Sequence, residues 1–540
     1  MGRAMGRRSW MKTWWLWATL LGLLWVGPYV MAWRQQGDAW VFTGFLFAVE
    51  DGNSYIAKML LGYHGAWRFT SPHTVEPQRG YWLYGPYLLL GKLAWGADVH
   101  TRLVVLFHLF RLVAGGLLAW ALWAFLGLFT QGRGRRAAWL MALLGGGLGW
   151  VPWLWRPEHL PLSWYSPEGF GFLMPWGLPH LALARALLLL LLTRLLRLYP
   201  DVRREETAFE GKGLVALPLL LGWIHGFQLA PLAVLSGGLF LWSLLQEGAK
   251  GLELRRFRKA AHLHGPFLVM LAAAPWLLYL AYLARTDPFI QAWTAQNVLP
   301  TPAWPTLAWA YLWVLPWAWS GWRRLRRTRP TLAFFTGWWV VAALTLAHIP
   351  HPLQRRFLEG VWVALSALVG TALDTASPPS RPFSLGAWSH LVLPALAGIS
   401  PLLFGLAVLQ RAQRPAPPAF RPREEVVAFQ ALARMARVGD AVLATHTTGN
   451  PLPAWAPVRV PLGLGPESVH AEAWSRRVRR FFQASTSDAW RQELLRTWRF
   501  RFVFYGPAER ALGAWNPDTA PYLHLRFRRG GYAIYEVVVP

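Results

Sequence analysis

Two adjacent carboxylates, Glu50 and Asp51, follow the first long apolar run of the chain and are well placed to do chemistry. An acidic pair close to a bilayer is costly unless it is paired, hydrated or used. A carboxylate at this position can act as a general base on a hydroxyl group, or hold a divalent cation (Mg²⁺ or Mn²⁺) against a phosphate. The alternative interpretation is that the pair only stabilises the N-terminal end of a following helix.

Arg355 and Arg356 are the best candidates for binding a phosphate group, because a guanidinium offers phosphate two parallel hydrogen bonds. The pair lies in a short loop predicted to face the outer side of the membrane. The tendency of cytoplasmic loops to collect basic residues therefore does not explain it. Two alternatives stay open: the side chains reach lipid phosphates of the outer leaflet, or they pair with Glu359.

Other polar side chains in segments predicted to face that side are candidates for the same site. They are Lys58, Arg68, Glu76, Glu158, Glu168, His180, His225 and Gln228. The histidines match no H-x-x-H or H-E-x-x-H spacing, so we expect hydrogen-bonded interfacial histidines rather than metal ligands. For Lys58 and Arg68 the alternative is ordinary exposure on a juxtamembrane helix.

The composition indicates that a membrane protein positions these residues. The chain of 540 residues is 54% hydrophobic and only 15% charged, which excludes a soluble globular protein and a disordered chain. Its formal net charge of +28 can suggest nucleic-acid binding, but the arginine clusters fall between apolar runs, so we expect no nucleic-acid partner. The sequence has no cysteine, which excludes disulfides and thiol chemistry.

The apolar runs and basic loops predict a mainly α, polytopic membrane protein with about 11 transmembrane helices. Basic residues before the first run and in the loop 323–329 place the N-terminus in the cytoplasm and the C-terminal region outside. The predicted crossings are 14–33, 101–129, 138–155, 178–197, two short helices within 213–245, 264–284, 304–322, 331–348, 357–374 and 387–410.

Two stretches are not predicted to be simple crossings. If the aromatic run 81–97 crossed, the basic loop 131–136 would face outside, so we expect a juxtamembrane helix in the outer interface. The run 213–245 has basic segments at both ends, so we expect a hairpin with its tip near 225–228. Broken helices of this kind place polar groups at depth in a membrane.

The composition changes after residue 410. A proline-rich linker, 411–422, precedes an α/β domain over 423–540. Its predicted elements are a helix at 423–437, strands at 441–445 and 500–505, a polar helix at about 470–497, and a hairpin formed by 522–528 and 532–539. The polar segment 445–450 is read as a turn, since no glycine-rich phosphate-binding pattern occurs. A nucleotide-sugar donor is therefore not indicated.

The first outer loop, 34–100, resembles that of the GT-C class of integral-membrane glycosyltransferases, in particular the dolichyl-phosphate-mannose–protein mannosyltransferase-like members. Glu50-Asp51 matches the acidic position of the class, and Tyr84-Gly85-Pro86-Tyr87 is similar to its proline motif, with glycine in place of the first proline. The resemblance extends over 1–410 in architecture, but over only 45–130 in residues. An odd number of crossings followed by an outer α/β domain is also similar.

The resemblance implies transfer of a sugar from a polyprenyl-phosphate donor to an acceptor hydroxyl outside the plasma membrane. Asp51, or else Glu50, would be the catalytic base or the metal-associated acid. The partners would be the lipid-linked donor, membrane lipids, and a glycan, lipid or protein acceptor. Two alternatives are a transporter or flippase of a lipid-linked saccharide, and a non-catalytic scaffold whose C-terminal domain recruits a partner.

Overall fold

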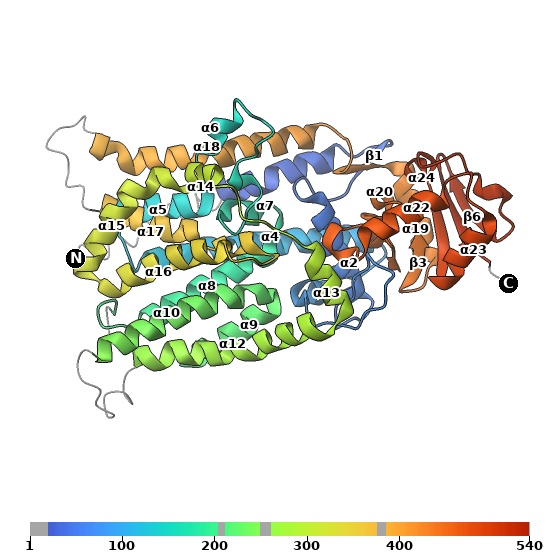
Figure 1. Cartoon of the computed structure of the whole chain (residues 1–540). Helices are drawn as coiled ribbons and strands as arrows, with labels where there is room; N and C mark the ends of the chain where they lie inside the picture. The colour runs from blue at the N-terminus through green and yellow to red at the C-terminus, as the bar shows by residue number, and fades with distance from the viewer. Residues whose placement is uncertain (1–19, 204–210, 249–260, 375–384, 539–540) are drawn as a thin grey trace. The chain divides into compact units, whose positions relative to one another are not determined.

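The structure is a computed structural model, and it describes residues 20–203, 211–248, 261–374 and 385–538 (Figure 1). The chain divides into two compact units. The first consists of 1–110, 283–297 and 408–540, and the second of 111–282 and 298–407. Each unit therefore joins stretches that are far apart in the sequence.

Most of the described chain is helical, and seven helical segments in it are long and apolar enough to cross a membrane. Each overlaps a predicted crossing or the predicted hairpin, so a mainly α, polytopic architecture is confirmed. The first predicted crossing lies partly outside the described residues, of which 20–34 are helical. The seven segments are Val99–Leu126, Pro179–Leu196, Lys212–Gly248, Ala261–Thr286, Pro330–Ala347, Gln354–Leu373 and Trp388–Gln413.

The predicted hairpin is present in the second unit. Helix α9 (Gly211–His225) ends at a single turn, η3 (Gly226–Gln228), and α10 (Leu229–Gly248) follows. Gly213 lies against Arg194, and Ser243 hydrogen-bonds Tyr199 at 2.8 Å, so both ends of the hairpin lie near the C-terminal end of α8 (Pro179–Leu196). At the tip, the His225 ring is 5.5 Å from that of His180, which begins α8.

The remaining long helices of the second unit bring the basic loops to one end. α10 packs on α16 (Pro330–Ala347), which packs on α17 (Val361–Leu373) (Figure 1). Thr331 at the start of α16 donates a backbone hydrogen bond of 2.9 Å to Asp201, which follows α8. Thr130, just beyond α4 (Val99–Leu126), hydrogen-bonds Asp374 at the end of α17 at 2.5 Å. The described parts of the predicted cytoplasmic segments in this unit therefore meet at the same end.

Two predicted crossings are wrong as continuous helices. In place of 138–155, α5 (Gly132–Leu144) ends before three glycines, and only the single turn α6 (Trp150–Trp153) follows. Gly147 lies against the backbone of Ala310, so a helix with side chains does not fit there. In place of 304–322, α14 (Trp304–Tyr311), η4 (Leu312–Val314) and α15 (Leu315–Thr328) follow one another. Pro316 interrupts the hydrogen-bond ladder, and α15 continues through the basic segment predicted to be a loop.

In the first unit, two helices of the first outer loop pack backbone against backbone. α2 (Val49–Tyr63) lies on α3 (Gly85–Gly91), and a Cβ added at Gly62 would come within 2.0 Å of the Leu88 carbonyl oxygen. A Cβ added at Gly91 would similarly lie 1.8 Å from the Met59 oxygen. The juxtamembrane helix predicted over 81–97 is only these seven residues long.

Short non-local pairings complete the first unit. Strand β1 (Trp40–Phe42) pairs antiparallel with β2 (Phe420–Pro422), which lies within the predicted linker. α13 (Pro288–Gln296) joins from a segment between two membrane helices. Its N-terminal residue Asp287 accepts a hydrogen bond of 2.9 Å from the Tyr81 hydroxyl. Burial and this bond raise the pKa of Tyr81.

The C-terminal part of the first unit is an α/β sandwich. Its five-stranded sheet has the order β4-β3-β5-β7-β6. The strands are β3 (Asp440–Leu443), β4 (Val458–Arg459), β5 (Phe500–Tyr505), β6 (Leu523–Arg529) and β7 (Tyr532–Val537). β3 pairs parallel with β4 and β5, and β7 antiparallel with β5 and β6. The predicted strands and the predicted hairpin are confirmed.

Helices cover both faces of this sheet. α19 (Arg423–Met435) packs on the face that carries Phe502 and Phe504, whereas Val503 points to α22 (Ala471–Phe481) and α23 (Asp488–Thr497). The single polar helix predicted over 470–497 is wrong. It is two helices, because α22 ends at Phe481 and α23 begins after Ser487.

Candidate functional site

The acidic pair lies in the first turn of α2. Glu50 is exposed and Asp51 is half-buried. The chain enters the helix through Ala48 at φ 47°, and the ring of Phe45 packs against Gly52, where a Cβ would come within 2.3 Å. A first-turn carboxylate is stabilised by the helix dipole, so this position suits both the chemical and the helix-stabilising interpretation.

Lys58, a predicted donor-binding residue, is part of a buried ion pair. Its ammonium lies 2.7 Å from Glu467 and 4.4 Å from the centroid of the Tyr84 ring. Ser71 donates a hydrogen bond of 3.0 Å to the other carboxylate oxygen, and the His73 ring is 3.9 Å away. Burial alone would raise the pKa of Glu467, but the Lys58 charge, with His73, lowers it to about 2. The charge of Lys58 is therefore neutralised within the first unit.

The tyrosines of the 84–87 segment hold α2 in place. Tyr84, at φ 55°, precedes α3, and the Tyr87 ring stacks on Tyr55 of α2 at 4.6 Å. Asn53 of α2 donates a hydrogen bond of 2.8 Å to Asn450, which lies in the segment predicted to be a polar turn. The segment that carries the resemblance thus forms the support of the acidic helix.

The other predicted residues of this loop lie in different surroundings. Glu76 accepts a hydrogen bond of 3.1 Å from the Trp474 indole, which ties the loop to α22. Arg68 is exposed, with its guanidinium 5.5 Å from the Trp82 ring centroid.

A second group of predicted residues converges in the second unit. Arg355 and Arg356 lie in η5 (Gln354–Leu358), and their Nε atoms are 3.8 and 3.9 Å from the two carboxylate oxygens of Glu168. Both Nε atoms are buried and have no hydrogen-bond partner among the described residues. Glu168 therefore lies between two guanidinium charges but accepts no hydrogen bond from the Nε–H group of either arginine.

An interior ion pair that the sequence reasoning missed supports this group. Arg185 of α8 contacts Glu359 at 2.6 Å, and both side chains are buried. The same guanidinium donates to the backbone oxygens of Pro167 at 3.0 Å and Glu168 at 2.6 Å. The signal was an arginine in the first half of a leucine-rich span, far from its basic C-terminal end, where a charge is costly unless it is paired. We call Glu168, Arg185, Arg355, Arg356 and Glu359 the arginine–glutamate cluster.

The hairpin tip borders the arginine–glutamate cluster. The Arg356 guanidinium lies 5.7 Å from the Phe227 ring centroid, and buried Gln228 lies beside Glu359. His225, next to His180 across the tip, lies close enough to Arg356 to sense its charge. The structure thus brings together six residues that the sequence analysis placed on one side: Glu168, His180, His225, Gln228, Arg355 and Arg356. Glu158 is exposed next to His159.

The charge balance of the arginine–glutamate cluster is positive. It contains three guanidiniums and two carboxylates, and one of those carboxylates is taken up by Arg185. Arg355 pairs with Glu168. One alternative in the sequence analysis was a pair with Glu359, which the structure does not have. The arrangement suits an additional anion. Asp51 belongs to the first unit and the cluster to the second, so a shared cavity stays a prediction.

No protein-family model and no curated protein sequence matches the chain, but solved structures do. ArnT from Cupriavidus metallidurans bound to undecaprenyl phosphate has a TM-score of 0.51 at 13% identity, covering 97% of this chain and 98% of ArnT. The apo oligosaccharyltransferase of Archaeoglobus fulgidus has a TM-score of 0.51 at 12% identity, covering 95% and 73%. A variant of the mycobacterial arabinofuranosyltransferase AftD has a TM-score of 0.53 at 14% identity, covering 97% and 42%.

The chain has the GT-C fold. Its likeness to ArnT extends over nearly the full length of both chains. The GT-C architecture expected from the first outer loop is therefore confirmed, and the protein is an integral membrane protein.

Proposed function

We propose that the protein is a membrane glycosyltransferase that moves a sugar from a polyprenyl-phosphate donor to an acceptor hydroxyl. The observation that carries the proposal is the arginine–glutamate cluster. It offers unsatisfied guanidinium donors and surplus positive charge in a fold that ArnT and the archaeal oligosaccharyltransferase share, both solved with a polyprenyl phosphate bound. The proposed acceptor is a glycan, a lipid or a protein.

Arg355 and Arg356 would bind the donor phosphate. When the bond between the anomeric carbon and the phosphate oxygen breaks, the leaving oxygen gains negative charge, which preorganised guanidiniums stabilise. Glu168 would keep the two arginines oriented before the donor arrives, and Arg185 would position the segment that carries Glu168. His225 and Gln228 would border the donor from the hairpin tip.

Asp51 is the proposed base. It would accept the proton of the acceptor hydroxyl as the oxygen bonds to the anomeric carbon. Within the described ranges no group of three His, Cys, Asp or Glu side chains suits a metal ion such as Mg²⁺ or Mn²⁺. The proposal assigns the donor phosphate to the arginines, and transfer measured with and without EDTA decides whether Asp51 also holds a divalent cation against that phosphate.

The proposed orientation has the N-terminus in the cytoplasm of the cell, and the acidic helix, the arginine–glutamate cluster and the 423–540 region outside the plasma membrane. Basic loops collect on the cytoplasmic side of membrane proteins. In the second unit the described parts of these loops lie at one end, and the hairpin tip, with the cluster, lies at the other.

The test is sugar transfer by the purified full chain in lipid nanodiscs, supplied with labelled polyprenyl-phosphate sugars. We expect Asp51→Asn and the double variant Arg355→Gln with Arg356→Gln to lose at least about 100-fold in rate, as expected when charge-assisted hydrogen bonds are removed. Arg156→Gln is the matched control, because Arg156 is an exposed arginine of the same predicted outer loop as Glu168.

Full transfer by the double arginine variant would contradict the phosphate-binding role. Full transfer by Asp51→Asn would leave the helix-stabilising interpretation of the acidic pair. Movement of the labelled lipid across the bilayer without any product would instead identify a transporter.

A further inference from the structure

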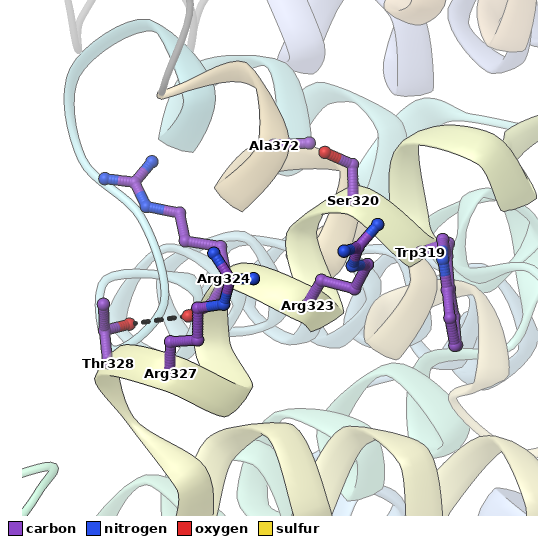
Figure 2. A pocket seen from close by; sticks show the side chains of 7 residues that line it. All are labelled: Trp319, Ser320, Arg323, Arg324, Arg327, Thr328 and Ala372. Carbon is purple, nitrogen blue, oxygen red and sulfur yellow. Dashed lines mark hydrogen bonds between the residues drawn. The ribbon is translucent and has the colours of Figure 1, made fainter.

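A basic hollow of about 440 Å³ lies in the second unit beside α15 and the end of α17 (Figure 2). Its lining includes Trp319, Ser320, Arg323, Arg324 and Arg327 from α15 and Ala372 from α17. The three arginines lie within two turns of one helix, and all three line this space (Figure 2).

The charge of the basic hollow is uncompensated. In the part of the chain that the structure describes, no carboxylate lies within ion-pair distance of Arg323, Arg324 or Arg327. Arg324 donates one long hydrogen bond, 3.3 Å, to the Thr371 carbonyl. Asp374, two residues beyond Ala372, instead accepts bonds of 2.5 and 2.7 Å from Thr130 and Gln131.

Topology alone does not explain this arrangement. The tendency of cytoplasmic loops to be basic does not require their side chains to point toward one another. Arg326, in the same run, lies 5.6 Å from the Trp322 ring centroid and does not line the basic hollow. Three neighbouring arginines surround a space that holds no acidic group of the lining, which is an arrangement suited to a multiply charged anion.

The position of the basic hollow indicates a membrane source for that anion. It lies next to the start of α16 and the end of α17, two helices that belong to candidate membrane spans. Trp319 at its rim is 60% exposed, and exposed tryptophans favour the headgroup region of a bilayer. Along α17, Ala372 is about 20 Å from the arginine–glutamate cluster, so the two sites are separate.

We propose that the basic hollow binds the phosphate of an anionic phospholipid headgroup. Arg323, Arg324 and Arg327 bind the phosphate oxygens, Ser320 provides a hydroxyl donor, and Trp319 lies against the glycerol and acyl region. Basic pockets between membrane helices bind anionic headgroups in this way. The site is distinct from the proposed donor site, so its occupancy does not depend on sugar transfer.

The experiment measures lipid binding by the full chain with native mass spectrometry in detergent. Phosphatidylglycerol, which is anionic, is compared with zwitterionic phosphatidylcholine. We expect phosphatidylglycerol to bind preferentially to the wild type and to Arg326→Gln. The double variant Arg323→Gln with Arg327→Gln should bind it about 25-fold more weakly, since each basic side chain at a charged membrane surface contributes about fivefold.

Two results would overturn the proposal: unchanged phosphatidylglycerol binding in the double variant, or an equal loss in Arg326→Gln, which would reveal a general charge effect. A separate arm adds inorganic phosphate and follows the thermal unfolding midpoint. Stabilisation by inorganic phosphate without preference for phosphatidylglycerol would overturn the lipid as the source. If the double variant does not fold, Arg327→Gln alone should still lose about fivefold.

Discussion

At the scale of residues, the most consequential contact in the first unit is the ion pair of Lys58 and Glu467. Both side chains are almost fully buried, at 1% and 3% exposure. Two buried charges that neutralise each other can be replaced together at little cost. Removing one of them leaves an uncompensated charge in the interior.

Glu467→Gln should therefore destabilise the first unit by about 3–5 kcal/mol, and a double variant of Lys58→Met and Glu467→Leu by much less. The measurement is the unfolding midpoint of the purified chain, followed by tryptophan fluorescence. Equal losses in the single and double variants would show that packing, and not charge, stabilises this contact.

The same pair predicts a dependence on acid. The pKa of Glu467 is about 2 in the folded protein, against an ordinary value of 4.5. A lowered pKa contributes stability above the ordinary value, and that contribution is lost as the pH falls toward the folded value. The wild type should therefore lose stability more steeply below about pH 4.5 than the Lys58→Met and Glu467→Leu double variant. Parallel unfolding curves for the two proteins would contradict this.

Residue type and side of the membrane were enough to predict much of the arginine–glutamate cluster. Charged groups at one end of membrane helices are costly to expose to lipid, so they face the protein interior and pair with one another. Glu168, Arg355 and Arg356 meet in this way. The role of Lys58 was not predictable from the loop alone, because its partner lies 409 residues further along the chain. Only the tertiary structure brings that carboxylate to α2.

At the scale of elements, hydropathy predicted the helices that are long and regular. α8, α16 and α4 begin and end within a few residues of their predicted bounds. It failed where backbone geometry decides, at the glycines that end α5 and at Pro316 before α15. A count of apolar residues contains no information about hydrogen bonds that a chain cannot make.

The packing of α2 on α3 gives a prediction of its own. Gly62→Ala should destabilise the first unit by about 1–3 kcal/mol, because overpacking forces the backbones apart. Its Cβ would come within 2.0 Å of the Leu88 oxygen. Gly116→Ala in α4 is the matched control, since nothing lies within 4 Å of the added Cβ. A loss no larger than the control's, measured as an unfolding midpoint, would show that α3 moves aside freely.

At the scale of the whole molecule, the preference of basic loops for the cytoplasmic side predicted the hairpin of α9 and α10 in the second unit. A single crossing over 213–245 would have separated Gly213 from Ser243, which the structure places near the same end of α8. The set of distant chain segments that form the first unit was not predictable in this way. β1 pairs with β2 although Trp40 and its partner Pro422 are 382 positions apart, and local patterns do not encode such pairings.

The buried ion pair of Lys58 and Glu467 also affects the order in which contacts can form during synthesis. The acidic helix is among the early parts of the chain to be synthesised, yet the carboxylate that neutralises its lysine is among the late ones. Until the ribosome has passed codon 467, Lys58 lacks its carboxylate partner, although α3 can already pack on α2. A chain that ends before residue 467 would therefore keep the packing of α2 on α3 but leave Lys58 without its ion-pair partner.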